Sequence, residues 1–207
     1  MNAEEFWSLP RSAAPAKVFL ELAPALPVRL PAATLQQVVV IHVRGAGGGV
    51  FSGRLVDGRL QMREGAIADP ICQVVLERAT LRELVAGSLR DRGLQIMEEL
   101  GRPRALPDFS RLPVRDDRAR ALSGLLGSVA LDIVDRRFGE TLRVVFTFGA
   151  APAAYEVASA TVTIDADEAV TWIARRVDPR AILKSGRLRV AGDLGLLTRA
   201  LGLLLES

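Results

Sequence analysis

Residues 160–168 read Ala-Thr-Val-Thr-Ile-Asp-Ala-Asp-Glu, and this stretch decides the fold class. Its apolar residues, Ala160, Val162 and Ile164, alternate with threonines, which is the period of a strand that buries one face. Asp165 then stands at the N-cap position of a helix expected over 166–176. The apolar residues on one side of that helix are Ala169, Ile173 and Val177, with Trp172 beside them. A strand that leads into an amphipathic helix indicates a mixed α+β fold.

A second stretch, residues 184–193, reads Lys-Ser-Gly-Arg-Leu-Arg-Val-Ala-Gly-Asp. After a turn of small residues, a strand is expected in which Leu188 and Val190 face inward and the arginines face outward. The Gly-Asp step places Asp193 as the N-cap of a helix expected over 193–205. Leucines recur along this helix at helical spacing: Leu194, Leu197, Leu201 and Leu204.

Elements of the same kinds precede these two stretches. A helix is expected over 116–126. Alternation then predicts strands with these inward residues: Val129, Leu131 and Ile133 in the first, Leu142, Val144, Phe146 and Phe148 in the second, and Tyr155 and Val157 in a short third.

The first half of the chain shows a similar series. A short helix is expected over 17–22, then strands over 38–44, 50–56, around Leu60 and Met62, and over 71–76. Asp57-Gly58 is a hairpin turn signal. Thr80 and Glu83 have the spacing of a capping box, which predicts that a helix over 80–88 begins at Thr80.

The two halves repeat at an offset of 88 residues. Val74, Leu76, Leu84, Val85 and Leu89 fall on Val162, Ile164, Trp172, Ile173 and Val177. We interpret this as the internal duplication of a unit of four strands and a helix, with two sheets related by a pseudo-two-fold axis. Residues 101–118 are rich in proline and arginine and predict the boundary. The expected domains are residues 1–107 and 108–207.

Residues 160–204 resemble the sterol-binding domain of the type-two sterol carrier protein family. The resemblance rests on residues 160–168, the Asp178-Pro179 step and residues 184–193. The first half is similar in its hairpin, its fourth strand and its helix up to Gly87. It departs from the family after Arg92, because residues 94–101 contain no Gly-Asp step.

This resemblance implies a five-stranded, mainly antiparallel sheet covered by helices, here duplicated, with an apolar tunnel between sheet and helices. It also implies binding or transfer of a fatty acyl chain, acyl-CoA, phospholipid, sterol or isoprenoid, without chemistry on it. Some bacterial relatives assist isoprenoid-quinone synthesis. The residues expected to line the tunnel are Phe146, Phe148, Val162, Ile164, Trp172, Ile173, Val177, Leu188, Leu197 and Leu201. The alternative is that they close-pack into a dry core.

Composition excludes several other classes. The chain is 49% hydrophobic, which excludes a disordered chain, and its net charge of +3 includes no basic run, so no nucleic-acid partner is expected. No uncharged apolar run reaches the roughly 18–20 residues of a membrane span. The acidic start of the chain is unlike a signal peptide, and the single cysteine, Cys72, suits a reducing compartment, so a cytoplasmic protein is expected.

Signals for catalysis and metal binding are scarce. The sequence has no nucleophile elbow, P-loop or zinc-protease motif, and Gly45–Gly49 reads as a hairpin loop. His42 is the single histidine, which excludes a multi-histidine metal site and leaves Cys72 as the one thiol for a Cys–His pair. No catalytic residue, metal or cofactor is therefore expected. Arginines near the boundary, with Arg175, Arg176 and Arg180, suggest either a phosphate site or a solvated surface.

The sequence thus favours a non-enzymatic lipid-binding or lipid-transfer protein built as a tandem repeat. The alternative function is a ligand-free protein-interaction or scaffold module. The expected partner is a hydrophobic small molecule or lipid. Phe6 and Trp7 offer a transient membrane contact, although docking on the protein's own core is the favoured interpretation for them. The sequence leaves the oligomeric state open.

Overall fold

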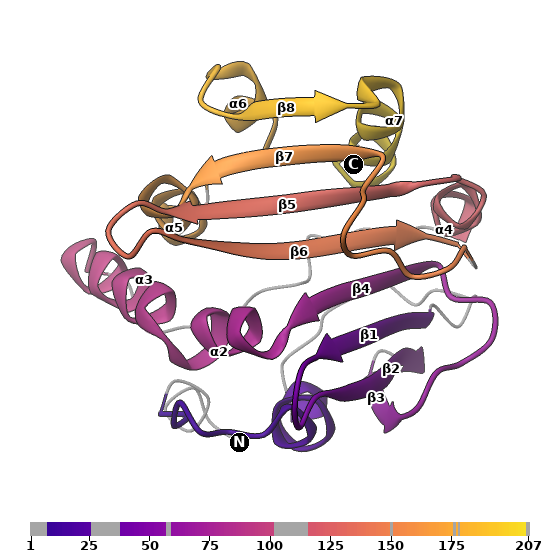
Figure 1. The fold of residues 1–207 in the computed structure, drawn as a ribbon, viewed down its shortest axis with the longest axis horizontal. Coiled ribbons are helices and arrows are strands. Elements are labelled where there is room, and N and C mark those ends of the chain that lie inside the picture. The colour runs from indigo at the N-terminus through magenta and orange to yellow at the C-terminus, as the bar shows by residue number, and fades with distance from the viewer. Residues whose placement is uncertain are drawn as a thin grey trace.

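The computed structural model describes residues 8–25, 38–56, 59–101, 116–149, 151–175, 177 and 179–205. Within these ranges the chain forms one sheet of eight strands in the order β3-β2-β1-β4-β6-β5-β7-β8 (Figure 1). The strands are β1 (Val38–Arg44), β2 (Gly49–Val56), β3 (Arg59–Glu64), β4 (Cys72–Glu77), β5 (Ser128–Asp135), β6 (Glu140–Phe148), β7 (Ala160–Asp165) and β8 (Arg189–Gly192).

The mixed α+β class is confirmed, whereas the five-stranded sheet is wrong. The prediction of two separate sheets is also wrong, because β4 from the first half pairs antiparallel with β6 from the second. The pairing runs from Cys72 opposite Phe148 to Leu76 opposite Val144. The described parts of the two halves therefore share one continuous backbone ladder.

Both halves nevertheless use the same pairing pattern. In the first half, β1 pairs antiparallel with β2 and parallel with β4. In the second half, β5 pairs antiparallel with β6 and parallel with β7. Since β1, β4, β5 and β7 all run in one direction, the halves follow one another side by side across the sheet. The equivalent strands also follow in the same lateral order, β2-β1-β4 and then β6-β5-β7. A two-fold axis would reverse either the direction or the lateral order of the strands in one half, so the expected axis is excluded; the duplication itself stays a prediction.

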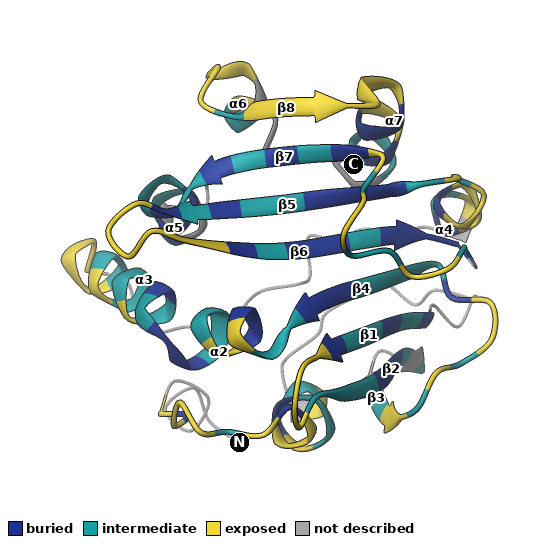
Figure 2. Cartoon of the chain, in the orientation of Figure 1, coloured by how far each residue is buried: buried dark blue, intermediate teal, exposed yellow. Residues whose placement is uncertain are grey.

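Helices pack on one face of this sheet, and buried residues run along its central strands (Figures 1 and 2). The helical segments are η1 (Lys17–Leu22), η2 (Ala23–Ala25), α2 (Arg78–Ala86), α3 (Ser88–Glu99), α4 (Asp116–Ser123), α5 (Ala166–Arg175), α6 (Pro179–Lys184) and α7 (Leu194–Leu205). The helices expected over 17–22, 166–176 and 193–205 are thus present to within one residue. In each half, a helix directly follows the parallel strand: α2 follows β4, and α5 follows β7.

Two of the three predicted helix caps are confirmed. Asp165 Oδ1 accepts the backbone N–H of Asp167 at 3.0 Å, and Asp193 Oδ1 accepts that of Leu196 at 2.9 Å. The capping box at Thr80 is wrong, because α2 begins at Arg78 and Thr80 is buried within it.

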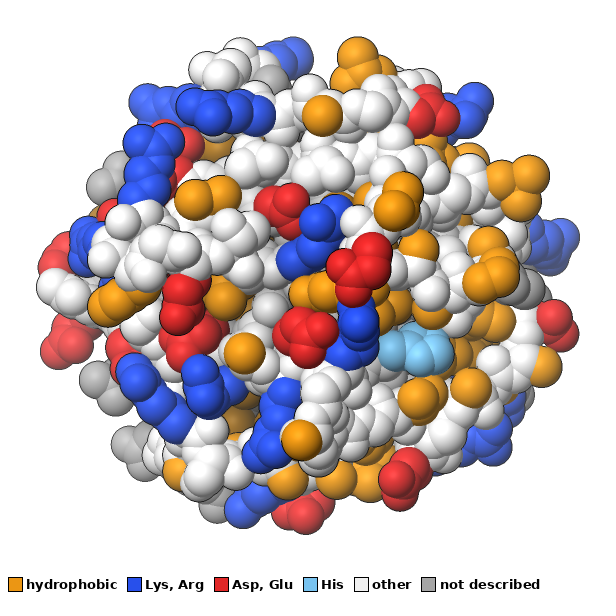
Figure 3. All heavy atoms as spheres, viewed as in Figure 1, with side chains coloured by type: hydrophobic (Ala, Val, Ile, Leu, Met, Phe, Trp, Pro, Cys, Tyr) orange, Lys and Arg blue, Asp and Glu red, His pale blue; other side chains and the backbone are white. Residues whose placement is uncertain are grey.

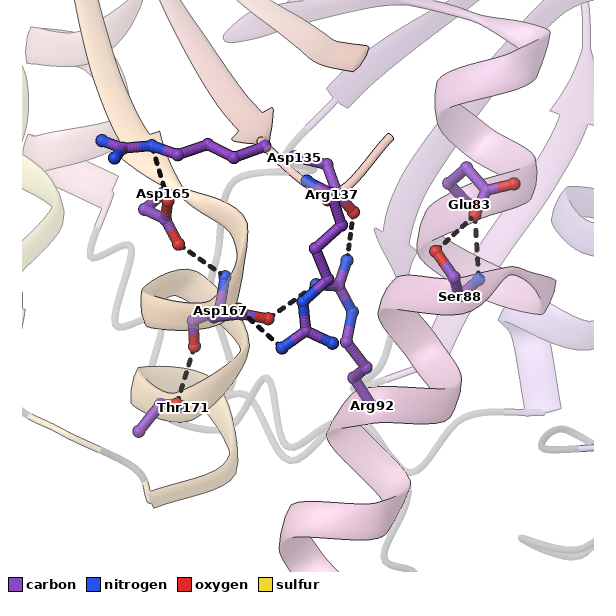
Figure 4. A network of polar contacts seen from close by, with 9 residues as sticks. Glu83, Ser88, Arg92, Asp135, Arg137, Asp165, Asp167 and Thr171 are labelled. Carbon is purple, nitrogen blue, oxygen red and sulfur yellow. Dashed lines mark hydrogen bonds and ion pairs between the residues drawn. The ribbon is translucent and has the colours of Figure 1, made fainter. Parts of the chain in front are cut away.

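The carboxylate of Glu83 caps the next helix instead. Its Oε2 accepts the backbone N–H of Ser88 at 2.8 Å and the Ser88 hydroxyl at 3.1 Å, at the start of α3 (Figure 4). This helix occupies the segment where the sequence departs from the family pattern, and it packs on α5.

The short strand expected at Tyr155 and Val157 is absent. Both edges of β5 and of β6 are already paired, so no edge is open to it. The segment instead crosses the face opposite the helices, where Tyr155 and Ala158 pack on Val75, Ala130 and Val145. The guanidinium of Arg44 lies 4.4 Å from the centre of the Tyr155 ring. Charged side chains of both signs occupy the middle of this face (Figure 3).

Several predictions fall outside the described residues. Phe6 and Trp7 do, and so does most of the predicted boundary, with the division at 107 and 108 inside it. The division into two domains therefore stays a prediction.

Candidate functional site

Eight of the ten residues expected to line a tunnel lie in three packed clusters on the helix-covered face. Phe148, Val162 and Leu197 are buried in one cluster, with Leu188 and Leu201 against it. Ile164 belongs to a second cluster, against which Trp172 and again Leu188 pack. Phe146 packs on a third, nearer β1. Val177 is half-buried after α5, and Ile173 belongs to α5 but its side chain lies outside the described part.

A cavity of about 130 Å³ lies beside the second cluster, between α2, α3, α5 and β5. Its lining is almost wholly apolar and consists of Leu84, Leu89, Arg90, Gly93, Met97, Ile133, Ala169, Val170 and Ala174. Of the predicted residues whose side chains the structure describes, none lines it. The cavity therefore lies between α3 and α5, beside the packed clusters that hold most of the predicted residues.

Small residues on facing helices explain why this space is open. Gly93 lies in the interior of α3 and faces α5, and a Cβ added to it would lie 3.6 Å from Val170 Cγ1. Ala169 and Ala174 are the small residues that α5 contributes. A glycine inside a helix disfavours that helix, so its presence is the sequence signal for this site, although it does not say which face is hollow.

The only charged side chain among the described lining residues, Arg90, is bound within the protein. Its Nη1 donates to the carbonyl oxygen of Leu9 at 2.9 Å, and its Nη2 lies 2.8 Å from Asp91 Oδ1. The side chain is 12% exposed. Because the guanidinium is already paired, the cavity presents mainly hydrocarbon to a ligand.

An ion-pair network next to the cavity fastens α3 to the second half of the chain (Figure 4). Arg92 pairs with Asp135 at the end of β5, and its Nη1 lies 2.6 Å from Asp167 Oδ1 in the first turn of α5. Arg137 Nη2 lies 2.9 Å from the other oxygen of Asp167. The Asp135 side chain is 6% exposed and also accepts the backbone N–H of Arg137 at 3.0 Å. The network therefore helps to hold α3 over the cavity.

A Cys–His pair is excluded by the register of the sheet. Val39 is the partner of Cys72 and Val75 that of His42, so Cys72 and His42 lie on opposite faces. The His42 ring contacts the Gln73 amide at 3.1 Å, and burial raises the pKa of Cys72 from 9.0 to about 12. The Cys72 thiol is therefore protonated near neutral pH, the opposite of what a nucleophile needs.

Other kinds of site find little support in the described part of the chain. It holds no group of three or more His, Cys, Asp or Glu residues placed to bind a metal ion. No helix there has the length and apolar character to span a membrane. The boundary arginines at 102, 104, 111 and 115 lie outside that part, as do Arg176 and the side chains of Arg175 and Arg180. Arg118, the remaining boundary arginine, is half-buried in α4.

Comparisons with known proteins give a few distant structural matches. No protein-family model and no curated protein matches the chain. Sterol carrier protein 2 like 2 from Aedes aegypti is 15% identical, with a TM-score of 0.30, and the match covers 54% of this chain and 92% of that one. Sterol carrier protein 2 from Yarrowia lipolytica is 10% identical, with a TM-score of 0.26, covering 62% and 89%. A ubiquinone synthesis protein, UbiJ-SCP2, is 14% identical, with a TM-score of 0.23, covering 91% and 85%.

Proposed function

We propose that this protein binds part of a hydrophobic ligand, such as the end of an acyl or isoprenoid chain, between α3 and α5 without chemical change to it. The observation that carries the proposal is the apolar cavity there, in which Arg90, the charged residue among the described lining, is already paired. Burying an apolar group of a ligand against such a lining removes its surface from water, which favours binding. The absence of chemistry rests on the sequence, which lacks catalytic motifs.

The size of the cavity limits what enters it. At about 130 Å³ it is close to the roughly 150 Å³ of an engineered cavity that binds benzene, and below the roughly 300–1,000 Å³ of sites that enclose a whole ligand. It therefore accommodates one end of a chain or a single ring. A longer ligand would extend out of the cavity or move α3 away from α5.

Ligand uptake tests this proposal directly. We expect native mass spectrometry of freshly purified protein, or of protein offered oleic acid, to show a bound lipid mass. A Trp7→Phe variant leaves Trp172 as the only tryptophan, and Trp172 packs on the cluster that contains Leu89 and Val170 of the cavity wall. Its fluorescence is therefore expected to change as oleic acid binds.

A pair of leucine substitutions on α3 provides the control. Gly93→Leu fills the cavity and is expected to reduce oleic acid uptake by about tenfold or more, a loss of roughly 1.4 kcal/mol. Gln95→Leu adds the same side chain at an exposed position of the same helix and should leave uptake unchanged. Repeated ligand-free spectra, with no uptake of offered acyl chains, would overturn the proposal in favour of a ligand-free interaction module.

A further inference from the structure

Three large apolar side chains stand almost free in solvent at one end of the sheet. Leu126 is 86% exposed, Val157 81% and Leu194 59%. Leu126 lies just before β5, Val157 just before β7 and Leu194 just after β8. Because β5 and β7 are parallel and β8 is antiparallel to β7, these three positions share one end of the sheet. We call them the loop-tip cluster.

Hydrogen bonds join the three loops that carry this cluster. The backbone N–H of Ser128 donates to Ser159 Oγ at 3.1 Å, and that of Asp193 donates to the Ser159 carbonyl at 2.8 Å. A Cβ added to Gly127 would lie 2.7 Å from Ser159 Oγ and 2.8 Å from Leu196 Cδ2, so the loops are in close contact. These contacts hold the three loops that carry the cluster in fixed positions relative to one another.

The base beneath the loops is part of the packed core. Leu122 of α4 and Leu196 of α7 are buried together in the first cluster described above. The core beside these loops is therefore well packed. The exposure of Leu126, Val157 and Leu194 does not come from poor packing of this region. Exposed apolar side chains that gather at one end of a molecule, rather than standing singly, mark interaction surfaces.

We infer that the loop-tip cluster inserts into the surface of a lipid bilayer. A stable complex between two copies needs about 800 Å² from each partner, or roughly 20–30 residues, and three loop-tip side chains supply far less. A bilayer demands no complementary shape and takes up apolar side chains singly, with basic residues favouring anionic lipid. The two helices next to these loops, α4 and α7, each carry an exposed arginine, Arg120 and Arg199.

The surface at this end fits that assignment. Orange side chains protrude from the molecular edge over α4 and the start of β5, with a blue side chain beside them (Figure 3). The acids at the same loops include Asp193, whose Oδ1 accepts the Leu196 N–H as the cap of α7, and Glu156, which pairs with Arg44 at 2.7 Å. Another exposed apolar residue, Phe138, is 64% exposed in the turn between β5 and β6, at the opposite end of the sheet.

Vesicle flotation with the full chain tests the inference, using vesicles of phosphatidylcholine and phosphatidylglycerol in equal parts. A triple variant, Leu126→Ser, Val157→Ser and Leu194→Ser, is expected to lower binding at least about tenfold, because binding scales with the apolar area inserted. Phe138→Ser removes an equally exposed apolar side chain elsewhere and should leave binding unchanged. Both variants should keep the melting temperature of the parent, since the altered side chains are exposed in the fold.

Three results would overturn the inference. These are the absence of vesicle binding by the parent chain, an equal loss of binding in Phe138→Ser, or a dimeric parent that the triple variant converts to monomer. The third result would assign the cluster to contacts between copies. The outcome is independent of the ligand cavity, because the triple variant leaves α3 and α5 intact and should still take up oleic acid if the parent does.

Discussion

Arg92 and Arg137 both pair with the carboxylate of Asp167, but their surroundings differ. The Arg92 side chain is 15% exposed and also pairs with Asp135, which is almost fully buried, whereas the Arg137 side chain is 63% exposed. Removing one partner of a buried pair leaves the other charge without compensation, while an exposed pair contributes little. The two arginines therefore contribute differently to the free energy of unfolding, although each forms an ion pair with Asp167.

We predict that Arg92→Gln lowers the free energy of unfolding by about 3–5 kcal/mol, and Arg137→Gln by about 1 kcal/mol or less. Urea unfolding of both variants measures the difference. The double variant Arg92→Leu with Asp135→Leu should be more stable than Arg92→Gln alone, because it leaves no buried charge at Asp135. Equal losses in the two single variants would contradict the role given to Asp135.

At the residue scale, the sequence predicts best where the partner is local. Asp165 and Asp193 bind backbone groups two and three residues away, so their capping roles could be read from spacing alone. The spacing of Thr80 and Glu83 gave a wrong start for α2. The helix begins at Arg78, directly after β4 ends, so its start is set by the end of the strand. The Arg92 network joins residues far apart in the chain, and no local pattern encodes it.

At the scale of elements, the contact between α3 and α5 explains the candidate site. Gly93 sits where a side chain of modest size would fit, since a Cβ there meets Val170 at an ordinary contact distance of 3.6 Å. Gly87, just before α3, is the opposite case. A Cβ there would lie 2.2 Å from Glu83 Oε2 and 2.5 Å from the Glu83 Cα, whose backbone position cannot move freely.

We predict that Gly93→Ala raises the free energy of unfolding by up to about 1 kcal/mol, because alanine favours the helix and occupies part of the cavity. Gly87→Ala should lower it, since the methyl group collides with α2. Chemical denaturation of the two variants checks both signs. A destabilising Gly93→Ala would show that the space beside Val170 is not open.

Strands and most helices could be predicted because their periodicity is local. Alternation along β5, β6 and β7 identified the face that the helices cover, where Ile133, Val144 and Ile164 are buried. It did not show that Ala130 and Val145 on the opposite face are buried too, because the segment that covers them is distant in sequence. The strand expected at Tyr155 failed for a non-local reason, because β5 and β6 had no open edge to pair with. The cavity was missed for a similar reason: Gly93 reveals a gap only once the helix opposite it is known.

At the scale of the whole molecule, the similar order of elements in the two halves could be predicted from the sequence, while their assembly into one sheet could not. The sequence pattern is the same whether the halves form two sheets or one. One sheet forms because β4 pairs with β6, which lies on the other side of the predicted boundary. This pairing is a tertiary contact that no local sequence pattern encodes. This pairing also makes the first half dependent on the second.

The last prediction follows from that dependence. In a fragment of residues 1–107, β4 loses its partner β6 along the ladder from Cys72 to Leu76, and α3 loses the α5 surface that it packs on. A long apolar strand edge without a partner is a template for aggregation, and Arg92 would lack both of its acids. We therefore expect the fragment to aggregate or to remain molten, without a cooperative thermal transition by circular dichroism, while the full chain unfolds cooperatively. A sharp, reversible transition in the fragment would show that the first half completes its own core, and the pairing of β4 with β6 would then join two independently stable units.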